Sequence, residues 1–308
     1  MKVIFLGTPN FAVEVLKAIH QSHHEVVAVV CQPDKPSGRG NKMLPPPTKV
    51  YAQEQGLAVF QFNKISREGV DTLKQLDADV LVTAAYGQIL SKDVLEIAPN
   101  GVINVHGSLL PKYRGSSPIQ WAILNGETKT GITIMRTNVG IDDGDMLTSK
   151  EIEITDEDTD ATMFEKLSKL GASMIVEALD MIESGQAKFV PQGDDSSYYP
   201  MIKKEMAQID FSKTGREIDC LVRAFNSWPV AFFNYDTQVF KVFKVGAKKM
   251  QISAQNGEVI KSNSKEGLFI KCGDGLIEIV ELQAPNGKRM TAKSYLNGKK
   301  IEVGAVLN

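Results

Sequence analysis

The sequence predicts an α/β protein: a Rossmann-like, mostly parallel sheet with helices on both faces, followed by a small C-terminal β-barrel of OB-like type. Three observations lead to this fold class. In the first half, short apolar segments alternate with segments of helical periodicity. The apolar segments are hydrophobic on both faces, as strands in a covered parallel sheet are. From about residue 207, short strands with alternating polarity, separated by Gly and Asn, replace this pattern.

The elements of the first half follow in a regular order. We expect strands at 2–7, 25–32, 57–61, 78–86, 101–106, 131–138 and 146–154. We expect helices at 10–21, 47–56, 67–76, 92–98 and about 159–186. The last helix begins after three acidic residues, which suit the positive end of a helix dipole. The carboxyl ends of the parallel strands are where such a sheet binds its ligands.

The chain of 308 residues is longer than one hydrophobic core usually supports, so two domains are expected. We place a catalytic domain at 1–189, a turn-rich linker at 190–206 and a barrel domain at 207–308. The barrel domain would hold one helix and four alternating strands, at 215–225, 238–245, 257–262, 267–273 and 275–283.

Composition limits the class of protein. An apolar content of 43% and a charged content of 23% are ordinary for a soluble globular chain. Three scattered cysteines, Cys31, Cys220 and Cys272, are too few for a disulfide framework. The apolar start "MKVIFLG" is too short for a signal peptide, and no apolar run approaches the ~20 residues of a spanning helix. We therefore expect a soluble, cytoplasmic protein without a membrane partner.

The two halves differ in charge. Residues 207–308 hold 15 Lys and Arg against 10 Asp and Glu, a net of +5, which leaves −7 for residues 1–206 of a chain whose net charge is −2. A basic barrel beside an acidic domain favours a polyanionic partner for the barrel. The alternative is a solvated surface whose imbalance arises by chance, because +5 is modest for a nucleic-acid-binding domain.

The turn after the first strand, "GTPNFA" (7–12), does not match a dinucleotide fingerprint. It has one glycine where that motif needs three, and Pro9 removes an amide donor that a pyrophosphate would need. We therefore do not expect NAD or FAD to bind here.

Three of the four histidines, His20, His23 and His24, lie around the end of the first helix. No carboxylate or cysteine stands near them in sequence at the spacing of metal ligands. Histidines at a helix C-terminus commonly complement the helix dipole. We expect that role for them and no metal site.

The segment "QPDKPSGRGNKMLPPPTK" (32–49) is too long for an ordinary connection between a strand and a helix. It is rich in glycine, and its four basic residues, Lys35, Arg39, Lys42 and Lys49, outnumber Asp34. It lacks the G-K-[ST] ending of a P-loop. We interpret it as an arm that contacts a nucleic-acid backbone; the alternative is a mobile, solvated loop.

The stretch "GVINVHGSLLPKYRGSSPIQ" (101–120) holds the best catalytic candidates. Strand alternation places Asn104 and His106 on one face, at the end of a buried strand. A second polar cluster, "VGIDDGD" (139–145), offers the aspartates at 142, 143 and 145. A carboxylate from it would favour the charged imidazole and hold its orientation. A serine-hydrolase reading of Ser108 fails, because no G-x-S-x-G elbow surrounds it.

An amide, an imidazole and a carboxylate without a protein nucleophile suit a reaction in which the substrate brings its own. When an amine attacks an acyl carbon, an oxyanion forms. Asn104 and a protonated His106 can each donate to that oxygen, a contribution of roughly 3–4 kcal/mol per donor. Moving protons from the amine to the leaving nitrogen is the remaining task. Each residue also has a purely structural reading, as a satisfied buried amide or a turn residue.

Several motifs occur together in a characteristic order: "GTPNFA", "QPDKPSGRG", "INVHGSLLPKYRG", "SPIQWAILNGE", "GITIMRTNVGIDDGD" and "VRAFNSWP". With this order and spacing, the chain resembles the methionyl-tRNA formyltransferase family along essentially its full length. "NVHGSLLP" with a later D-x-G-D is shared by the wider group of enzymes that use 10-formyltetrahydrofolate. The arginine-containing loop and "RAFNSWP" narrow the resemblance to the enzymes that act on tRNA.

The resemblance implies formyl transfer from 10-formyltetrahydrofolate to the α-amine of methionine on initiator tRNA, without a metal. It implies Asn104, His106 and Asp142 as the catalytic residues. It implies that the folate is bound by the turn after the strand, by "AYGQIL" (85–90) and by the loop before Asp142, with these residues: Ser108, Leu109, Leu110, Pro111, Ile89, Val139, Gly140 and Ile141. We expect a monomer.

For tRNA, the resemblance implies Arg39 in the loop, and we add Lys42. In the linker, Met201 and Gln208 replace a lysine and an arginine that similar enzymes commonly carry. Lys203 and Lys204 are the candidates to supply that charge. Three alternatives share the catalytic motif: a formyltransferase acting on a sugar amine or glycinamide ribotide, a formyltetrahydrofolate hydrolase, and a non-catalytic RNA-binding protein on an enzyme scaffold. The first two would need neither the basic loop nor the barrel.

Overall fold

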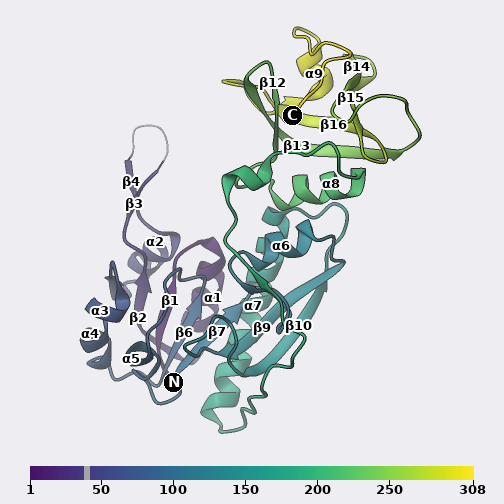
Figure 1. Cartoon of the computed structure of the whole chain (residues 1–308). Coiled ribbons are helices and arrows are strands. Elements are labelled where there is room, and N and C mark those ends of the chain that lie inside the picture. The colour runs from purple at the N-terminus through teal and green to yellow at the C-terminus, as the bar shows by residue number, and fades with distance from the viewer. Residues whose placement is uncertain (38–41) are drawn as a thin grey trace. The chain divides into compact units, whose positions relative to one another are not determined.

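The computed structural model describes residues 1–37 and 42–308. The chain divides into two compact units, each drawn in Figure 1. Unit 1 comprises residues 1–118, 130–152 and 164–199. Unit 2 comprises residues 119–129, 153–163 and 200–308. No helix within the described ranges is long and apolar enough to cross a membrane.

Unit 1 is built on a seven-stranded sheet whose order is β10-β9-β7-β6-β1-β2-β5. Its strands are β1 (Lys2–Gly7), β2 (Glu25–Cys31), β5 (Val59–Gln61), β6 (Val80–Ala84), β7 (Val102–His106), β9 (Lys129–Arg136) and β10 (Met146–Glu153). β1 pairs in parallel with β2 and β6, and β6 pairs in parallel with β7. β9 runs antiparallel to β7. The mostly parallel sheet is therefore confirmed.

Helices cover both faces of this sheet (Figure 1). On one face, Ile4, Leu6 and Ala28 share a core with residues of three short helices, α3 (Ile65–Glu68), α4 (Val70–Lys74) and α5 (Lys92–Leu95). On the other lie α1 (Asn10–His20), which contacts α2 (Pro47–Glu54), and the long α7 (Asp160–Glu183). Where α7 crosses Val105, the chain has Gly171, and a Cβ there would lie 2.8 Å from that valine.

Two segments differ from the expected elements. The helix expected at 67–76 is two helices, α3 and α4, that meet at Gly69. A Cβ at Gly69 would lie 3.0 Å from side-chain atoms of Ile65 and Phe62. The backbone therefore passes close to these two side chains where the first helix ends and the second begins. The segment 32–49 includes a hairpin of β3 (Lys35–Ser37) and β4 (Lys42–Leu44) instead of loop alone.

The segment expected to be a linker contributes a strand to unit 1. β11 (Tyr198–Tyr199) pairs in parallel with β8 (Arg114–Gly115). Gly115 has φ +98°, and a Cβ there would collide with the carbonyl oxygen of Tyr199. A glycine is therefore required where these two strands meet.

Unit 2 is a curled antiparallel sheet that forms a half-barrel, as expected for an OB-like domain (Figure 1). Its strands are β12 (Phe232–Tyr235), β13 (Gln238–Lys249), β14 (Val259–Asn263), β15 (Gly267–Cys272), β16 (Gly275–Gln283) and β17 (Met290–Thr291). Register shifts between β13 and β16 bend the sheet. The remaining elements of the chain are α6 (Pro118–Leu124), η1 (Lys204–Ala207), α8 (Gly215–Ala224) and α9 (Ala292–Leu296).

Local sequence explains how α8 begins and what holds the half-barrel. Thr214 accepts from the backbone of Glu217, and the Glu217 side chain accepts from the backbone of Thr214, a capping box. Within the sheet, the fully buried rings of Phe233 and Phe240 stack with their centroids 5.3 Å apart. Such ring pairs contribute roughly 0.5–1.5 kcal/mol beyond the area they bury.

Candidate active site

The candidate site lies at the carboxyl end of β7. Alternation along β7 turns Val105 toward α7 and places Asn104 and His106 on the opposite face of the sheet. His106 is buried, and Asn104 is half-buried. Because β1, β6 and β7 are parallel, their carboxyl ends meet at one edge of the sheet, the edge at which open α/β sheets bind ligands.

Asp142 supplies the carboxylate beside these two side chains. Its Oδ1 lies 3.4 Å from Asn104 Nδ2 and 3.6 Å from His106 Nδ1. Its Oδ2 accepts a hydrogen bond of 2.9 Å from the backbone N–H of Gly115. Asp142 has φ 48°, the left-handed region that aspartate tolerates better than most residues. The side-chain nitrogen of Asn104 and one ring nitrogen of His106 thus both lie beside one oxygen atom of Asp142.

The other ring nitrogen of His106 faces the backbone. Nε2 lies 3.0 Å from the carbonyl oxygen of Tyr113, an acceptor, so this nitrogen carries a proton. Tyr113 is itself held in place, because its ring stacks on that of Tyr199 with centroids 4.8 Å apart and its N–H donates to Ser197 Oγ at 2.9 Å. The imidazole is therefore oriented from both sides.

The turn after β7 is pinned by buried hydroxyls. Ser108 Oγ donates to the carbonyl oxygen of Lys112 at 2.9 Å, so this side chain is engaged within the turn. Thr133, fully buried on β9, donates to the carbonyl oxygen of Ser108 at 2.7 Å and accepts from the N–H of Leu110 at 3.1 Å. Leu110 is 7% exposed, while Leu109 and Pro111 are half-buried.

Apolar side chains proposed to contact a folate are exposed to an unusual degree. Ile89, in the loop after β6, is 81% exposed, and Val139 and Ile141, in the loop after β9, are 67% and 51% exposed. Between the latter two, the N–H of Gly140 donates to Asn138 Oδ1 at 2.7 Å, which shapes the loop. Large exposed apolar side chains in the loops after β6 and β9 suit a ligand with flat aromatic rings, whose faces pack against apolar groups.

Two residues that organise the site were not found in the sequence. Gln192 Nε2 donates to the backbone carbonyl oxygens of Asp142 and Gly144, both at 2.8 Å. Gln192 Oε1 accepts from Arg114 Nε at 3.0 Å and Nη2 at 2.7 Å. Gln192 is separated from Asp142 by 50 residues and from Arg114 by 78. No local motif relates residues that are so far apart in sequence.

The basic residues expected to contact nucleic acid lie in different parts of the structure. Arg39 lies outside the described residues, and Lys42 begins β4. Lys203 and Lys204, at the start of η1, are exposed. Lys49, which we counted with the basic arm, instead donates to Asp34 Oδ1 at 2.8 Å and to Gln61 Oε1 at 2.9 Å within unit 1. It therefore fastens the base of the hairpin.

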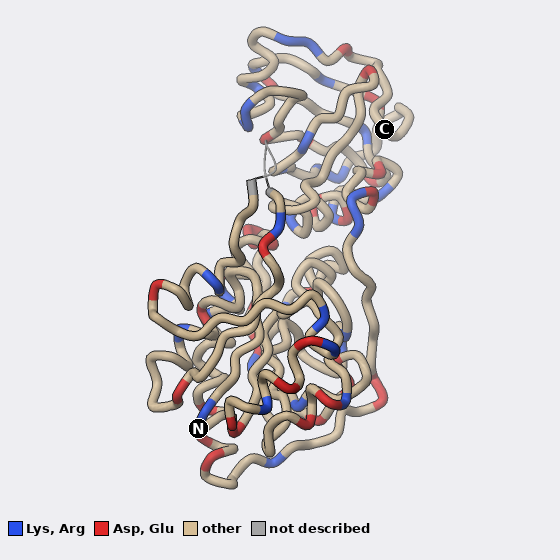
Figure 2. The backbone as a smooth tube through the Cα atoms, turned by 90° about the vertical axis from the view of Figure 1, so that its left-hand side faces the viewer, with Lys and Arg blue, Asp and Glu red and all other residues tan. Residues whose placement is uncertain are grey.

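Figure 2 shows Lys and Arg mixed with Asp and Glu along unit 2. Several of these basic side chains are paired with acidic ones inside the unit: Arg216 with Asp156, Arg223 with Asp219, Lys244 with Glu157 and Arg289 with Glu281. The net charge of +5 counted for residues 207–308 therefore overstates the free positive charge on unit 2, because Asp156 and Glu157 belong to this unit as well.

Comparisons with known proteins agree over the full chain. Residues 1–179 match the family described as "Formyl transferase", and residues 201–300 match "Formyl transferase, C-terminal domain". Proteins named methionyl-tRNA formyltransferase are 44% identical over 309 residues in Acetivibrio thermocellus and 45% identical over 311 residues in Ruminiclostridium cellulolyticum. Both alignments cover 100% of this chain and 99% of the relative.

Solved structures with the same fold include an N-formyltransferase from Helicobacter canadensis in complex with folinic acid and dTDP-3-aminofucose. It has a TM-score of 0.67 and 23% identity, covering 91% of this chain and 99% of that one. The sugar 3N-formyl transferase WlaRD has a TM-score of 0.68 and 24% identity, covering 94% and 99%. At this identity the two structures show the fold that they share with this chain.

Proposed function

Because the chain belongs to the methionyl-tRNA formyltransferase family, we propose that it transfers a formyl group from 10-formyltetrahydrofolate to the α-amino group of methionine on initiator tRNA, for translation initiation. The main support for this reaction is the position of Asn104 Nδ2 and His106 Nδ1, which lie 3.4 and 3.6 Å from the same atom, Asp142 Oδ1. Donors aimed at one point are what a developing oxyanion requires.

The bound folate supplies the formyl group. Asn104 and His106 donate to the formyl oxygen, on which negative charge develops as the amine adds to the carbon. Each donor contributes on the order of 3–4 kcal/mol to this step. The bond between the formyl carbon and N10 of the folate then breaks, and N10 leaves with a proton while the amine gives one up. Asp142 lies beside the His106 ring and fixes its orientation. The other oxygen of Asp142 accepts from the Gly115 N–H, which keeps the carboxylate in place beside the ring.

The residues around the site fit a folate. Its flat pterin and its chain require apolar walls, and the exposed side chains of Ile89, Val139 and Ile141 supply them from two loops. Leu109, Leu110 and Pro111 form the turn next to the catalytic strand, and Ser108 keeps that turn rigid. Gly140 allows the loop after β9, which carries Val139 and Ile141, to turn tightly. We assign these residues to the folate site.

The tRNA contacts proposed are Arg39, Lys42, Lys203 and Lys204. We assign catalysis to a domain at 1–189, a linker at 190–206 and tRNA binding to a domain at 207–308. Support comes from the position of Lys42 in the hairpin and from the exposure of Lys203 and Lys204. We further propose that the protein acts as a monomer in the cytoplasm, where its tRNA substrate is.

The assay that tests the function compares three acceptors with the same formyl donor: methionyl initiator tRNA, free sugar amines and water. Formylation of the tRNA at a rate well above the other two is expected. Faster transfer to a sugar amine, or hydrolysis alone, would assign the chain to one of the alternatives.

The tRNA assignment is tested with Arg39→Ala and the double variant K203A/K204A. Both should raise KM for tRNA, while folate binding stays within twofold. They should also make tRNA binding less sensitive to salt, because each phosphate that is no longer neutralised lowers the logarithmic slope by about one unit. Equal losses of tRNA and folate binding would contradict the assignment.

The catalytic assignment is tested with N104A and H106A. Each should lower kcat by about 10²–10³-fold, because each removes one donor from the oxyanion. Folate binding, measured by calorimetry, should change much less than kcat. Activity within tenfold of wild type in both variants would refute the assignment. Asn100→Ala is the control for loss of a half-buried amide, because Asn100 precedes the amino end of β7 and its side chain donates to the backbone carbonyl oxygen of Asp79.

A further inference from the structure

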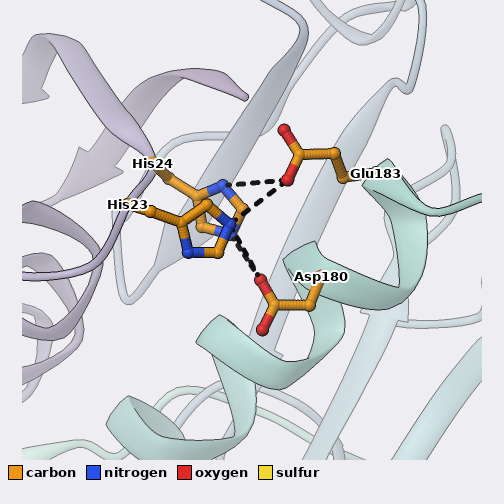
Figure 3. Close-up of side chains that lie close together, drawn as sticks. All are labelled: His23, His24, Asp180 and Glu183. Atoms are coloured by element: carbon orange, nitrogen blue, oxygen red, sulfur yellow. Dashed lines mark hydrogen bonds and ion pairs between the residues drawn. The ribbon is translucent and has the colours of Figure 1, made fainter.

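The structure brings together two histidines and two carboxylates at a place the proposed reaction does not use. His23 and His24 directly precede β2, and Asp180 and Glu183 lie in the last turn of α7. Figure 3 shows the two imidazoles side by side, with both carboxylates turned toward them from the helix. One ligand atom from each of the four residues fits within a span of 4.8 Å. Their separation in sequence, about 160 residues, hid this cluster from sequence analysis.

The distances match those between the ligands of a tetrahedral metal ion. His23 Nε2 lies 3.3 Å from Asp180 Oδ1 and 3.2 Å from Glu183 Oε2, and His24 Nε2 lies 3.0 Å from Asp180 Oδ1. Around Zn²⁺, with bonds of about 2.0–2.2 Å, neighbouring ligand atoms are about 3.3–3.5 Å apart. The largest spacing exceeds this, but the half-exposed side chains of Asp180 and Glu183 can rotate inward.

The charges in this cluster favour the binding of a cation. Two carboxylates occupy the last turn of α7, which contains no basic residue. The C-terminus of a helix carries partial negative charge, so acidic side chains there are unfavourable without a positive partner. Asp180 and Glu183 are three residues apart and therefore share one face of the helix. Two neutral imidazoles and two carboxylates balance one divalent ion.

The amine of Met1 supplies part of the positive charge beside these carboxylates. It contacts other atoms than those through which the histidines and carboxylates face one another. It donates to Glu183 Oε1 at 2.7 Å, while Oε2 of the same carboxylate faces His23. It also lies 3.1 Å from His24 Nδ1, whereas His24 Nε2 faces Asp180. Binding of a metal at Nε2 requires the tautomer with its proton on Nδ1, so the Met1 amine must pass its proton to Nδ1 and become the acceptor of this hydrogen bond, while the metal displaces the proton on Nε2. The fully buried side chain of His24 is the rigid member of the set.

We propose that His23, His24, Asp180 and Glu183 bind one Zn²⁺ ion, which ties the start of β2 to the end of α7. Imidazole and carboxylate ligands without thiolate suit Zn²⁺ among the divalent transition metals, with modest affinity. The cluster is at the amino end of β2, whereas His106 is at the carboxyl end of β7. These two ends lie at opposite edges of the parallel sheet. The ion would therefore stabilise unit 1 without taking part in formyl transfer.

The test uses the full chain, freed of metal with a chelator and titrated with ZnCl₂ or with CoCl₂, whose visible absorption reports tetrahedral ligands. We expect one Zn²⁺ per chain and a Tm that rises by a few degrees with Zn²⁺. His23→Gln changes an exposed ligand, so it should fold. It and Asp180→Asn should bind Zn²⁺ at least about tenfold more weakly and lose the Tm response. Formyl transfer should stay unchanged in both.

The matched controls are His20→Gln, a neighbouring histidine that instead contacts the Tyr51 hydroxyl, and Glu177→Gln, one turn earlier on α7. Both should bind Zn²⁺ as the wild type does. Less than one equivalent at a several-fold excess of ZnCl₂ would overturn the proposal. So would equal binding by H23Q, or loss of stability in the variants that is the same with Zn²⁺ and with chelator. The last result would show that these residues act only through their hydrogen bonds.

Discussion

The side-chain amide of Gln192 donates a hydrogen bond of 2.8 Å to the backbone carbonyl oxygen of Asp142, fifty residues earlier in the chain. A residue from the segment that leads out of unit 1 therefore fixes the loop that carries Asp142, the proposed catalytic carboxylate. The same amide accepts from Arg114. The position of Asp142 beside His106 thus depends on Gln192 and Arg114, which lie far from it in sequence.

Replacing Gln192 should lower kcat by displacing the loop that carries Asp142. In Gln192→Ala, the loop at Asp142 loses two hydrogen bonds and Arg114 loses its acceptor. We expect kcat to fall about 10–100-fold, because small displacements of catalytic groups have effects of this size. KM for tRNA should stay within about twofold. Steady-state formylation assays check this, with the exposed Gln186→Ala as the control. An unchanged kcat would mean that Asp142 holds its position without Gln192.

Asp142→Asn removes the negative charge of this side chain and leaves its shape nearly unchanged. The amide oxygen can still accept from the Gly115 N–H, so the loop should keep its conformation. Loss of the negative charge removes the carboxylate that lies beside the His106 ring and orients it. We expect kcat to fall at least about 10²-fold, with folate affinity nearly unchanged. Single-turnover formyl transfer and calorimetry measure the two effects separately. A loss of folate affinity as large as the loss of kcat would contradict this role.

Thr133, which is fully buried, and Thr137, which is half-buried with a buried hydroxyl, form a pair that tests the effect of hydrogen bonding on stability. Thr133→Val leaves the N–H of Leu110 and the carbonyl of Ser108 without their partner, at a cost of about 2–4 kcal/mol. Thr137 Oγ1 is buried without a hydrogen-bond partner among the described residues, so Thr137→Val should be neutral or slightly stabilising. Denaturant unfolding of both variants provides the comparison. Similar losses in the two would show that volume, and not hydrogen bonding, dominates at these sites.

Asp160 should make stability depend on pH. It is 1% exposed and accepts from the N–H of Ser227 at 3.2 Å and from that of Ala161 at 2.9 Å. Burial nevertheless raises the pKa of this carboxyl above its ordinary value of 3.8. A raised folded-state pKa means that the folded state binds the proton more tightly, so stability falls as pH rises from 3.8 through the folded pKa.

Asp160→Asn removes this titration. The stability of the wild type relative to D160N should therefore decrease as pH rises through that window and stay constant above it. Urea unfolding of both proteins at several pH values from about 4 to 7 measures the difference. A difference that grows with pH would show that hydrogen bonds from Ser227 and Ala161 outweigh burial.

Much of the fold follows from local pattern. The strands at 2–7, 25–31 and 102–106 were predicted within one residue, because doubly covered parallel strands are continuous apolar runs. The elements that were missed are short or depend on distant partners. β8 and β11 have two residues each and exist only because they pair with one another. The helix α6 was not distinguished from the motif around it.

The sequence by itself determined the family, the parallel sheet and the strand that presents Asn104 and His106 on one face. These features depend on periodicities and motifs within a few residues. Only the tertiary structure decided that Asp142 faces that strand, that Gln192 holds it there, and that Asp180 and Glu183 meet His23 and His24. Such contacts join loops and helix ends many residues apart. Their geometry comes from the packing of α7 and of the 190–199 segment on the sheet, which no local pattern encodes.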